Sequence, residues 1–100
     1  MRTAAKTDLT QRAIVSSLRE ASVSVHVLRE GRGIPDLLCS FGGFVCLIEC
    51  KTGRGELNEM QRKFRESFQG PVIVARTGEE AVSKFFTERA CALLGAVLGR

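Results

Sequence analysis

The stretch from Ile34 to Lys51 limits what this chain can fold into more than any other part of the sequence. Two apolar runs flank the pair Gly42-Gly43, and this pattern is typical of a β-hairpin with a two-residue turn. If the two glycines form the turn, Phe41 lies opposite Phe44 and the register of the whole hairpin is fixed.

That register brings two carboxylates together at the open end of the hairpin. Asp36 lies opposite Glu49, with their Cβ atoms roughly 5 Å apart. Lys51 follows two residues after Glu49 and projects from the same face of the strand. Facing carboxylates in an apolar sheet repel each other and lose hydration unless a cation lies between them. The sequence therefore predicts a site for a hard cation such as Mg²⁺, with an amine beside it.

Both faces of the predicted hairpin are apolar. The face of the carboxylates also carries Leu38, Val45 and Leu47, and the opposite face carries Leu37, Cys39, Phe41, Phe44, Cys46, Ile48 and Cys50. Strands of this kind usually lie in the middle of a sheet that is covered on both sides. We therefore expect cover over both faces of this hairpin.

The spacing of apolar residues predicts the remaining elements. We expect helices at about 7–21, 57–68 and 79–98, and further strands at about 23–27 and 72–76. Capping pairs support the last two helices: Asn58 with Gln61, and Thr77 with Glu80. The order is α-β-β-β-α-β-α, which predicts an α/β fold with a mixed central sheet in one domain over 1–100.

Composition excludes several classes of protein. The chain has 44% hydrophobic residues, 26% charged residues and a net charge of +4, which suits a globular domain with a polyanionic partner. No apolar run approaches the ~20 residues of a membrane-spanning helix, and no signal peptide is visible. The cysteines form no CxxC pair and fit buried thiols better than a zinc site or a disulfide framework. We expect a cytoplasmic, reducing location in a bacterial or phage-infected cell, with no membrane partner.

The predicted cation site suits hydrolysis of a phosphodiester. A divalent ion polarises a phosphoryl oxygen and activates water, and Lys51 can neutralise charge that develops on the phosphate. Taken singly, each residue also has a structural explanation, because Asp36 follows Pro35 at a strand start and Glu49 can pair with Lys51. Taken together, the hairpin and the spacing favour the site.

Basic residues flank this site in the sequence and are candidates for binding DNA phosphates with a salt-dependent affinity. They are Arg29, Arg32, Arg54, Arg62, Lys63 and Arg65. Arg32 and Arg54 are the stronger candidates because their loops adjoin the site, and ordinary surface charge is the alternative for every one of them. Other enzyme classes lack their motifs: neither glycine-bearing loop matches a nucleotide-binding fingerprint, and the single histidine, His26, has no evident nucleophile partner.

Pro35-Asp36 followed by Glu49-Cys50-Lys51 resembles the signature of the PD-(D/E)xK nuclease superfamily, and the element order is similar to its restriction-endonuclease-like core. The context around these residues resembles the stand-alone form of the virus-type replication-repair nuclease (VRR-NUC) family over about residues 8–82. This context comprises 33–37, 48–52, 55–57 and Gln61.

This resemblance implies a DNA endonuclease that uses Mg²⁺ or Mn²⁺ and leaves 5′-phosphate and 3′-hydroxyl ends. It implies that Asp36, Glu49 and the backbone carbonyl of Cys50 bind the metal, that Lys51 is the catalytic lysine and that Gln61 assists. For Gln61 the alternative is a purely structural role, since it can cap its helix.

The chain departs from the family pattern in its first helix, where the family usually supplies a metal-binding glutamate. The corresponding region offers Gln11 and Asp8, with Glu20 further along. If Gln11 occupies the position of the family's glutamate, metal affinity would be weaker, unless Asp8 takes the place of that glutamate. Each of these residues could equally be a cap or a solvated position. The departure favours an alternative function: a module that holds branched DNA, or docks a replication protein, without cutting.

Residues 90–98 carry no charge, and a helix that is apolar nearly all round needs cover on every side. We therefore expect a second copy of the chain to pack against this end, giving a homodimer through the 79–98 helix. Independently, stand-alone members of the resembled family tend to be homodimers that act on branched DNA such as Holliday junctions, which implies a role in replication, repair or recombination.

Overall fold

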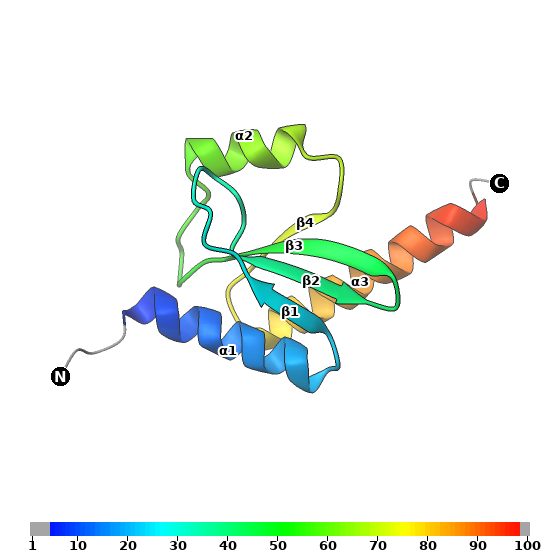
Figure 1. The fold of residues 1–100 in the computed structure, drawn as a ribbon, viewed down its shortest axis with the longest axis horizontal. Coiled ribbons are helices and arrows are strands. Elements are labelled where there is room, and N and C mark those ends of the chain that lie inside the picture. The colour runs from blue at the N-terminus through cyan, green and yellow to red at the C-terminus, as the bar shows by residue number, and fades with distance from the viewer. Residues whose placement is uncertain (1–4, 99–100) are drawn as a thin grey trace.

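The computed structural model describes residues 5–98. Its elements are α1 (Lys6–Glu20), β1 (Ser24–Val27), β2 (Leu37–Phe41), β3 (Phe44–Cys50), α2 (Glu59–Ser67), β4 (Val72–Ala75) and α3 (Gly78–Leu98). The four strands form one mixed sheet in the order β1-β2-β3-β4, in which only the β3–β4 pair is parallel (Figure 1). The predicted α/β order and mixed sheet are confirmed.

The predicted hairpin and its register are also confirmed. Gly42 and Gly43 have φ of 53° and 83°, which suits the tight turns that favour glycine at both central positions. Phe41 pairs with Phe44, and the ladder runs in step to Leu37 opposite Ile48. One position further along the same register, Asp36 comes opposite Glu49.

The core lies on one face of the sheet, beneath α1 and α3. Ile14 and Leu18 of α1 and Phe85 of α3 are fully buried, together with Leu37 and Ile48 of the hairpin. Figure 1 shows α1 on the side of the sheet away from α2, and α3 running behind the strands. This packing explains the spacing of apolar residues in α1 and in the first half of α3.

The other face of the sheet is only partly covered, so the expectation of cover on both faces is wrong. The helix on this side, α2, has only nine residues and buries none of them. Val45 of β3, on the same face, is 50% exposed. Gly33, in the loop before β2, lies against the backbone of α2. Its φ is 83°, and a Cβ there would lie 2.3 Å from the Met60 carbonyl oxygen. Figure 1 shows the 28–36 loop beside the start of α2.

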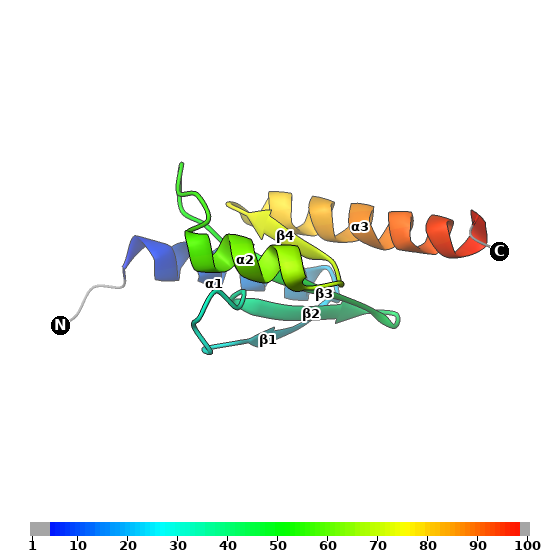
Figure 2. The ribbon, with the colours of Figure 1, turned by 90° about the horizontal axis from the view of Figure 1, so that it is seen from above.

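The last turns of α3 extend beyond the sheet (Figures 1 and 2). Their apolar side chains have no cover in the single chain, and the exposed ones are Leu93, Leu94, Val97 and Leu98. Within the described residues, no helix is long and apolar enough to cross a membrane.

Candidate active site

The two predicted carboxylates lie together. Asp36 comes immediately before β2, and the backbone N–H of Cys50 donates a hydrogen bond of 2.8 Å to its Oδ2. This bond holds the Asp36 side chain against β3, where its carboxyl group is hydrogen-bonded to that of Glu49. Glu49 is 3% exposed. The hairpin register and one backbone hydrogen bond therefore place both acids at the same point.

The surroundings of Glu49 oppose its ionisation. Burial raises the pKa of Glu49 to about 8, and the hydrogen bond and the charge of Asp36 act in the same direction. The charge of Lys51 and the N–H of Cys50 lower this pKa, but by less. Near neutral pH the carboxyl group of Glu49 therefore favours its protonated form.

A divalent cation fits this pair. Within residues 5–98, neither Asp36 nor Glu49 forms an ion pair within 4 Å with a lysine or arginine. The two adjacent carboxyl groups offer oxygen ligands, and a hard cation between them would offset the repulsion between their negative charges. The carbonyl oxygen of Cys50, which is next to Glu49 in the chain, is a further oxygen ligand of the kind that Mg²⁺ accepts.

Lys51 leaves the sheet beside this pair. Its backbone N–H donates to the Ala75 carbonyl at 3.0 Å, so it extends the β3–β4 pairing by one residue. The next residue, Thr52, donates a hydroxyl hydrogen bond of 3.2 Å to Thr10 of α1. The lysine is half-buried, and its position is fixed from both β4 and α1.

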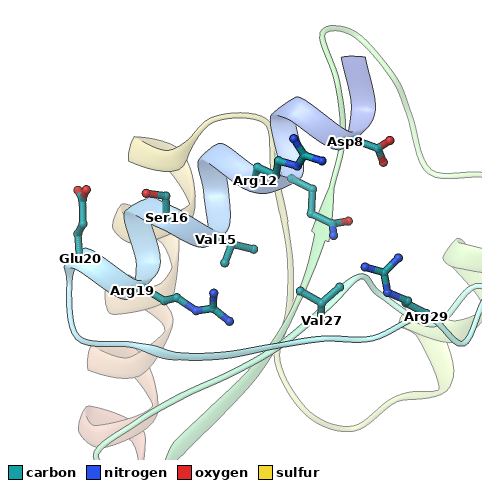
Figure 3. Close-up of a pocket in the computed structure, with 9 residues that line it drawn as sticks. Asp8, Arg12, Val15, Ser16, Arg19, Glu20, Val27 and Arg29 are labelled. Carbon is teal, nitrogen blue, oxygen red and sulfur yellow. The ribbon is translucent and has the colours of Figure 1, made fainter. Parts of the chain in front are cut away.

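The structure does not bring Asp8 to the carboxylate pair. In the described part of the chain, no three His, Cys, Asp or Glu side chains are grouped closely enough to hold a metal ion. Asp8 and Gln11 instead line a cavity of about 770 Å³ between α1 and the end of β1 (Figure 3). Arg12, Arg19 and Arg29 line the same cavity, whose lining does not include Asp36 or Glu49. Glu20, the third acid considered, also lies along it.

Gln61 caps α2. Its Oε1 accepts the N–H of Asn58 at 2.9 Å, and its own N–H donates to the Asn58 side chain at 2.9 Å. The structure thus confirms the predicted capping pair and shows the structural alternative for Gln61. Assistance in the active site stays a prediction, and it requires the amide to leave this bond.

The basic candidates lie in different surroundings. Lys63 forms an exposed ion pair of 3.3 Å with Glu59, which agrees with ordinary surface charge. Arg62 donates to the Leu57 carbonyl, while Arg29 lines the cavity of Figure 3. Arg32 and Arg54 are in the loops on either side of the hairpin, as predicted.

Cys39 and Cys46 are buried, as expected, whereas Cys50 is half-buried and Cys91 is exposed on α3. Burial raises the pKa of Cys39 and of Cys46 to about 12. Burial, Asp36 and Glu49 also raise the pKa of Cys50. These thiols are neutral at physiological pH, so Cys50 can offer its carbonyl, but not a thiolate, to an ion.

Arg76 lies next to Lys51 in the sheet, and the sequence did not single it out as a site residue. It directly follows β4, and Ala75 before it pairs with Cys50 of β3. The predicted strand at 72–76 together with a parallel pairing to the hairpin would have placed it beside Lys51, but nothing local in the sequence indicates that pairing.

Comparison of the chain with known protein families, with curated proteins and with solved structures found no match. The function is therefore argued from the carboxylate pair and its surroundings.

Proposed function

We propose that this protein is a metal-dependent endonuclease that hydrolyses DNA phosphodiester bonds. The observation that carries the proposal is the pair of Asp36 and buried Glu49: burial and the charge of Asp36 raise the pKa of Glu49, and within residues 5–98 neither acid forms an ion pair with a lysine or arginine. Such a pair is unfavourable in a fold unless it binds something positively charged. The resemblance to the PD-(D/E)xK and VRR-NUC signatures supports the same function.

Each residue then has a defined task. Asp36, Glu49 and the Cys50 carbonyl hold Mg²⁺ or Mn²⁺. When bound, such an ion polarises a phosphoryl oxygen and lowers the pKa of water. Lys51 stabilises the negative charge that develops on the phosphate as the bond breaks. The Asp36–Cys50 hydrogen bond orients the first carboxylate, so that it does not have to be ordered during the reaction.

The substrate in this proposal is branched DNA, as the resemblance to VRR-NUC and Holliday-junction-resolving enzymes implies. The net charge of +4 supports a polyanionic substrate. Two copies, joined through the exposed end of α3, would present two such sites to one junction. The proposed setting is replication, repair or recombination inside a bacterial or phage-infected cell.

The test is cleavage of a labelled four-way junction in Mn²⁺. We expect Lys51→Ala to lower the cleavage rate by ~10²-fold or more, because an electrostatic contact to the transition state is lost, while junction binding persists. Lys84→Ala is the matched control, since Lys84 is bonded to Glu80 and to the Val74 carbonyl on α3 and β4. Unchanged cleavage by Lys51→Ala would remove Lys51 from the mechanism.

A second candidate function is a module that binds branched DNA, or docks a replication protein, without cutting. In the part of the chain that the structure describes, no third acidic side chain joins the pair, and this favours the second candidate. Junction binding by the wild-type protein with no cleavage in Mg²⁺ or Mn²⁺ would establish the binding module over the nuclease.

A further inference from the structure

Within residues 5–98, two arginines have a buried side-chain nitrogen without a hydrogen-bond partner. The guanidinium Nη1 of Arg76 is buried and, within residues 5–98, has no hydrogen-bond partner. The Nε of Arg89 is also buried without a hydrogen-bond partner in this range, but the Arg89 guanidinium lies over the Phe41 ring, 5.0 Å from its centroid. A buried donor without a partner destabilises a fold, so each one calls for an explanation such as a bound ligand.

Arg76 lines a hollow of about 360 Å³ that we call the arginine hollow. It is bounded by Glu56, Leu57, Arg62, Arg65, Val74 and Arg76. Three guanidinium groups therefore surround it, with the single carboxylate of Glu56. In the described part of the chain none of the three arginines forms an ion pair within 4 Å. The hollow thus has an excess of positive charge.

The arginine hollow adjoins the carboxylate pair through the β3–β4 ladder. Val74, which lines the hollow, is the partner of Glu49 in this parallel pairing. The backbone N–H of Lys51 donates to Ala75, the residue before Arg76. Lys51 and Arg76 therefore leave the sheet side by side, at the carboxyl ends of parallel strands, where open α/β sheets usually bind their ligands.

We propose that the arginine hollow binds a phosphate group of the DNA strand, next to the phosphate that lies at Asp36 and Glu49. Guanidinium groups bind phosphate oxygens with paired, charge-assisted hydrogen bonds, and three guanidinium groups line this hollow. This inference rests on the proposed function in one respect, namely that DNA is the ligand of the adjacent site. It names Arg76 and Arg65 as phosphate-binding residues.

The experiment measures binding of a fluorescently labelled DNA duplex in EDTA, which prevents cleavage, between about 50 and 200 mM salt. We expect Arg76→Gln to weaken binding and to reduce the slope of log affinity against log salt by about 1, because one phosphate contact is lost. Arg76→Lys should keep the slope and still weaken binding, because lysine retains the charge but not the paired hydrogen bonds. Arg65→Gln should behave like Arg76→Gln.

Arg12→Gln is the charge-matched control, since it removes one positive charge from the cavity between α1 and β1. An equal loss of slope in Arg12→Gln and Arg76→Gln would show a general charge effect and overturn the site. Without DNA, Arg76→Gln should melt no lower than the wild type, because within residues 5–98 the buried Nη1 has no hydrogen-bond partner. A clear fall in Tm would show that Arg76 is satisfied within the fold, and would also overturn the proposal.

Inorganic phosphate separates a DNA site from a site for small anions. If phosphate raises the Tm of the wild type but not of Arg76→Gln, and the salt slope for DNA is the same in both, the hollow takes a free anion and the DNA assignment is wrong. The nuclease proposal can fail separately. If Arg76→Gln reduces the salt slope but the wild type does not cleave DNA, the phosphate site stands and the nuclease proposal is wrong. If the wild type cleaves DNA and Arg76→Gln leaves the salt slope unchanged, only the phosphate site is wrong.

Discussion

At the scale of single residues, the chemistry depends on how Glu49 is held. An exposed glutamate beside a lysine would stay ionised, whereas Glu49 is buried and shares its environment with Asp36. Its folded-state pKa of about 8 is above the ordinary value of 4.5. Glu49 therefore lowers the stability of the metal-free fold near neutral pH, and this cost is the physical basis of the proposed cation site.

The first prediction concerns pH. Between pH 4.5 and 8 the unfolded chain releases the Glu49 proton and the folded chain keeps it, so stability in EDTA should fall as pH rises through this window. Glu49→Gln should flatten the profile and stabilise the metal-free protein at pH 8 by about 2 kcal/mol, or roughly 10 °C in Tm. Glu59→Gln, at an exposed ion pair, is the control. The measurement is Tm against pH, and identical profiles for wild type and Glu49→Gln would contradict the assignment.

The second prediction concerns the metal. Mn²⁺ at pH 8 should raise the Tm of the wild type, because it binds the folded state only. At a concentration a hundred times its Kd, this binding stabilises the folded protein by about 2.7 kcal/mol. Asp36→Asn and Glu49→Gln should lose this effect. Asp8→Asn should retain it, since Asp8 lines the separate cavity of Figure 3. A rise lost in Asp8→Asn would place the first helix in the metal site after all.

At the scale of elements, α2 depends on one close backbone approach. The helix buries none of its residues, so the sheet alone does not fix its place. Gly33 lies against the backbone at Met60 and Gln61 and ties the helix to the loop that leads into β2. This contact sets the distance between α2 and the open face of the sheet, where the carboxylates and the arginine hollow lie.

The third prediction tests this contact with two glycines of the same loop. Gly33→Ala should destabilise the protein by about 2–4 kcal/mol, because the added Cβ meets the Met60 carbonyl oxygen and φ is positive. Gly31→Ala should cost only about 1–2 kcal/mol, because φ is also positive but nothing lies within 4 Å. Urea unfolding measures both, and equal losses would show that the contact with α2 contributes nothing.

At the scale of the whole molecule, the unusual feature is the free end of α3. The core buries the first half of this helix, up to Phe85, while the uncharged stretch at 90–98 extends beyond the sheet. Leu98 is 76% exposed, and Leu94 is 58% exposed. Contiguous apolar surface of this kind marks interaction sites in soluble proteins. A second copy offers the same apolar surface, so the two ends can cover each other about a two-fold axis.

The fourth prediction is the mass in solution. We expect light scattering at micromolar concentration to give the mass of two chains, and Leu94→Glu to give one chain, because a charge would be buried in the apolar contact. Val45→Glu is the control, since Val45 is similarly exposed but lies in β3. A wild-type mass of one chain would exclude this dimer.

The hairpin, its register and the capping of α2 were predictable from the sequence, because each depends on residues close together in the chain. Two glycines at the turn fix which residues face each other, and that alone brings Asp36 opposite Glu49. The Asn58–Gln61 cap likewise spans three residues.

The other features of the site depend on contacts between segments that are far apart in the chain. The partial cover of the second face follows from where α2 lies, and the sequence shows only that α2 is a helix. Asp8 was a candidate ligand because of its helix, but the packing of α1 directs it to another cavity. Arg76 follows Ala75 beside Lys51 because β4 runs parallel to β3. Burial and long-range pairing are properties of the packed molecule, so local patterns in the sequence could not contain them.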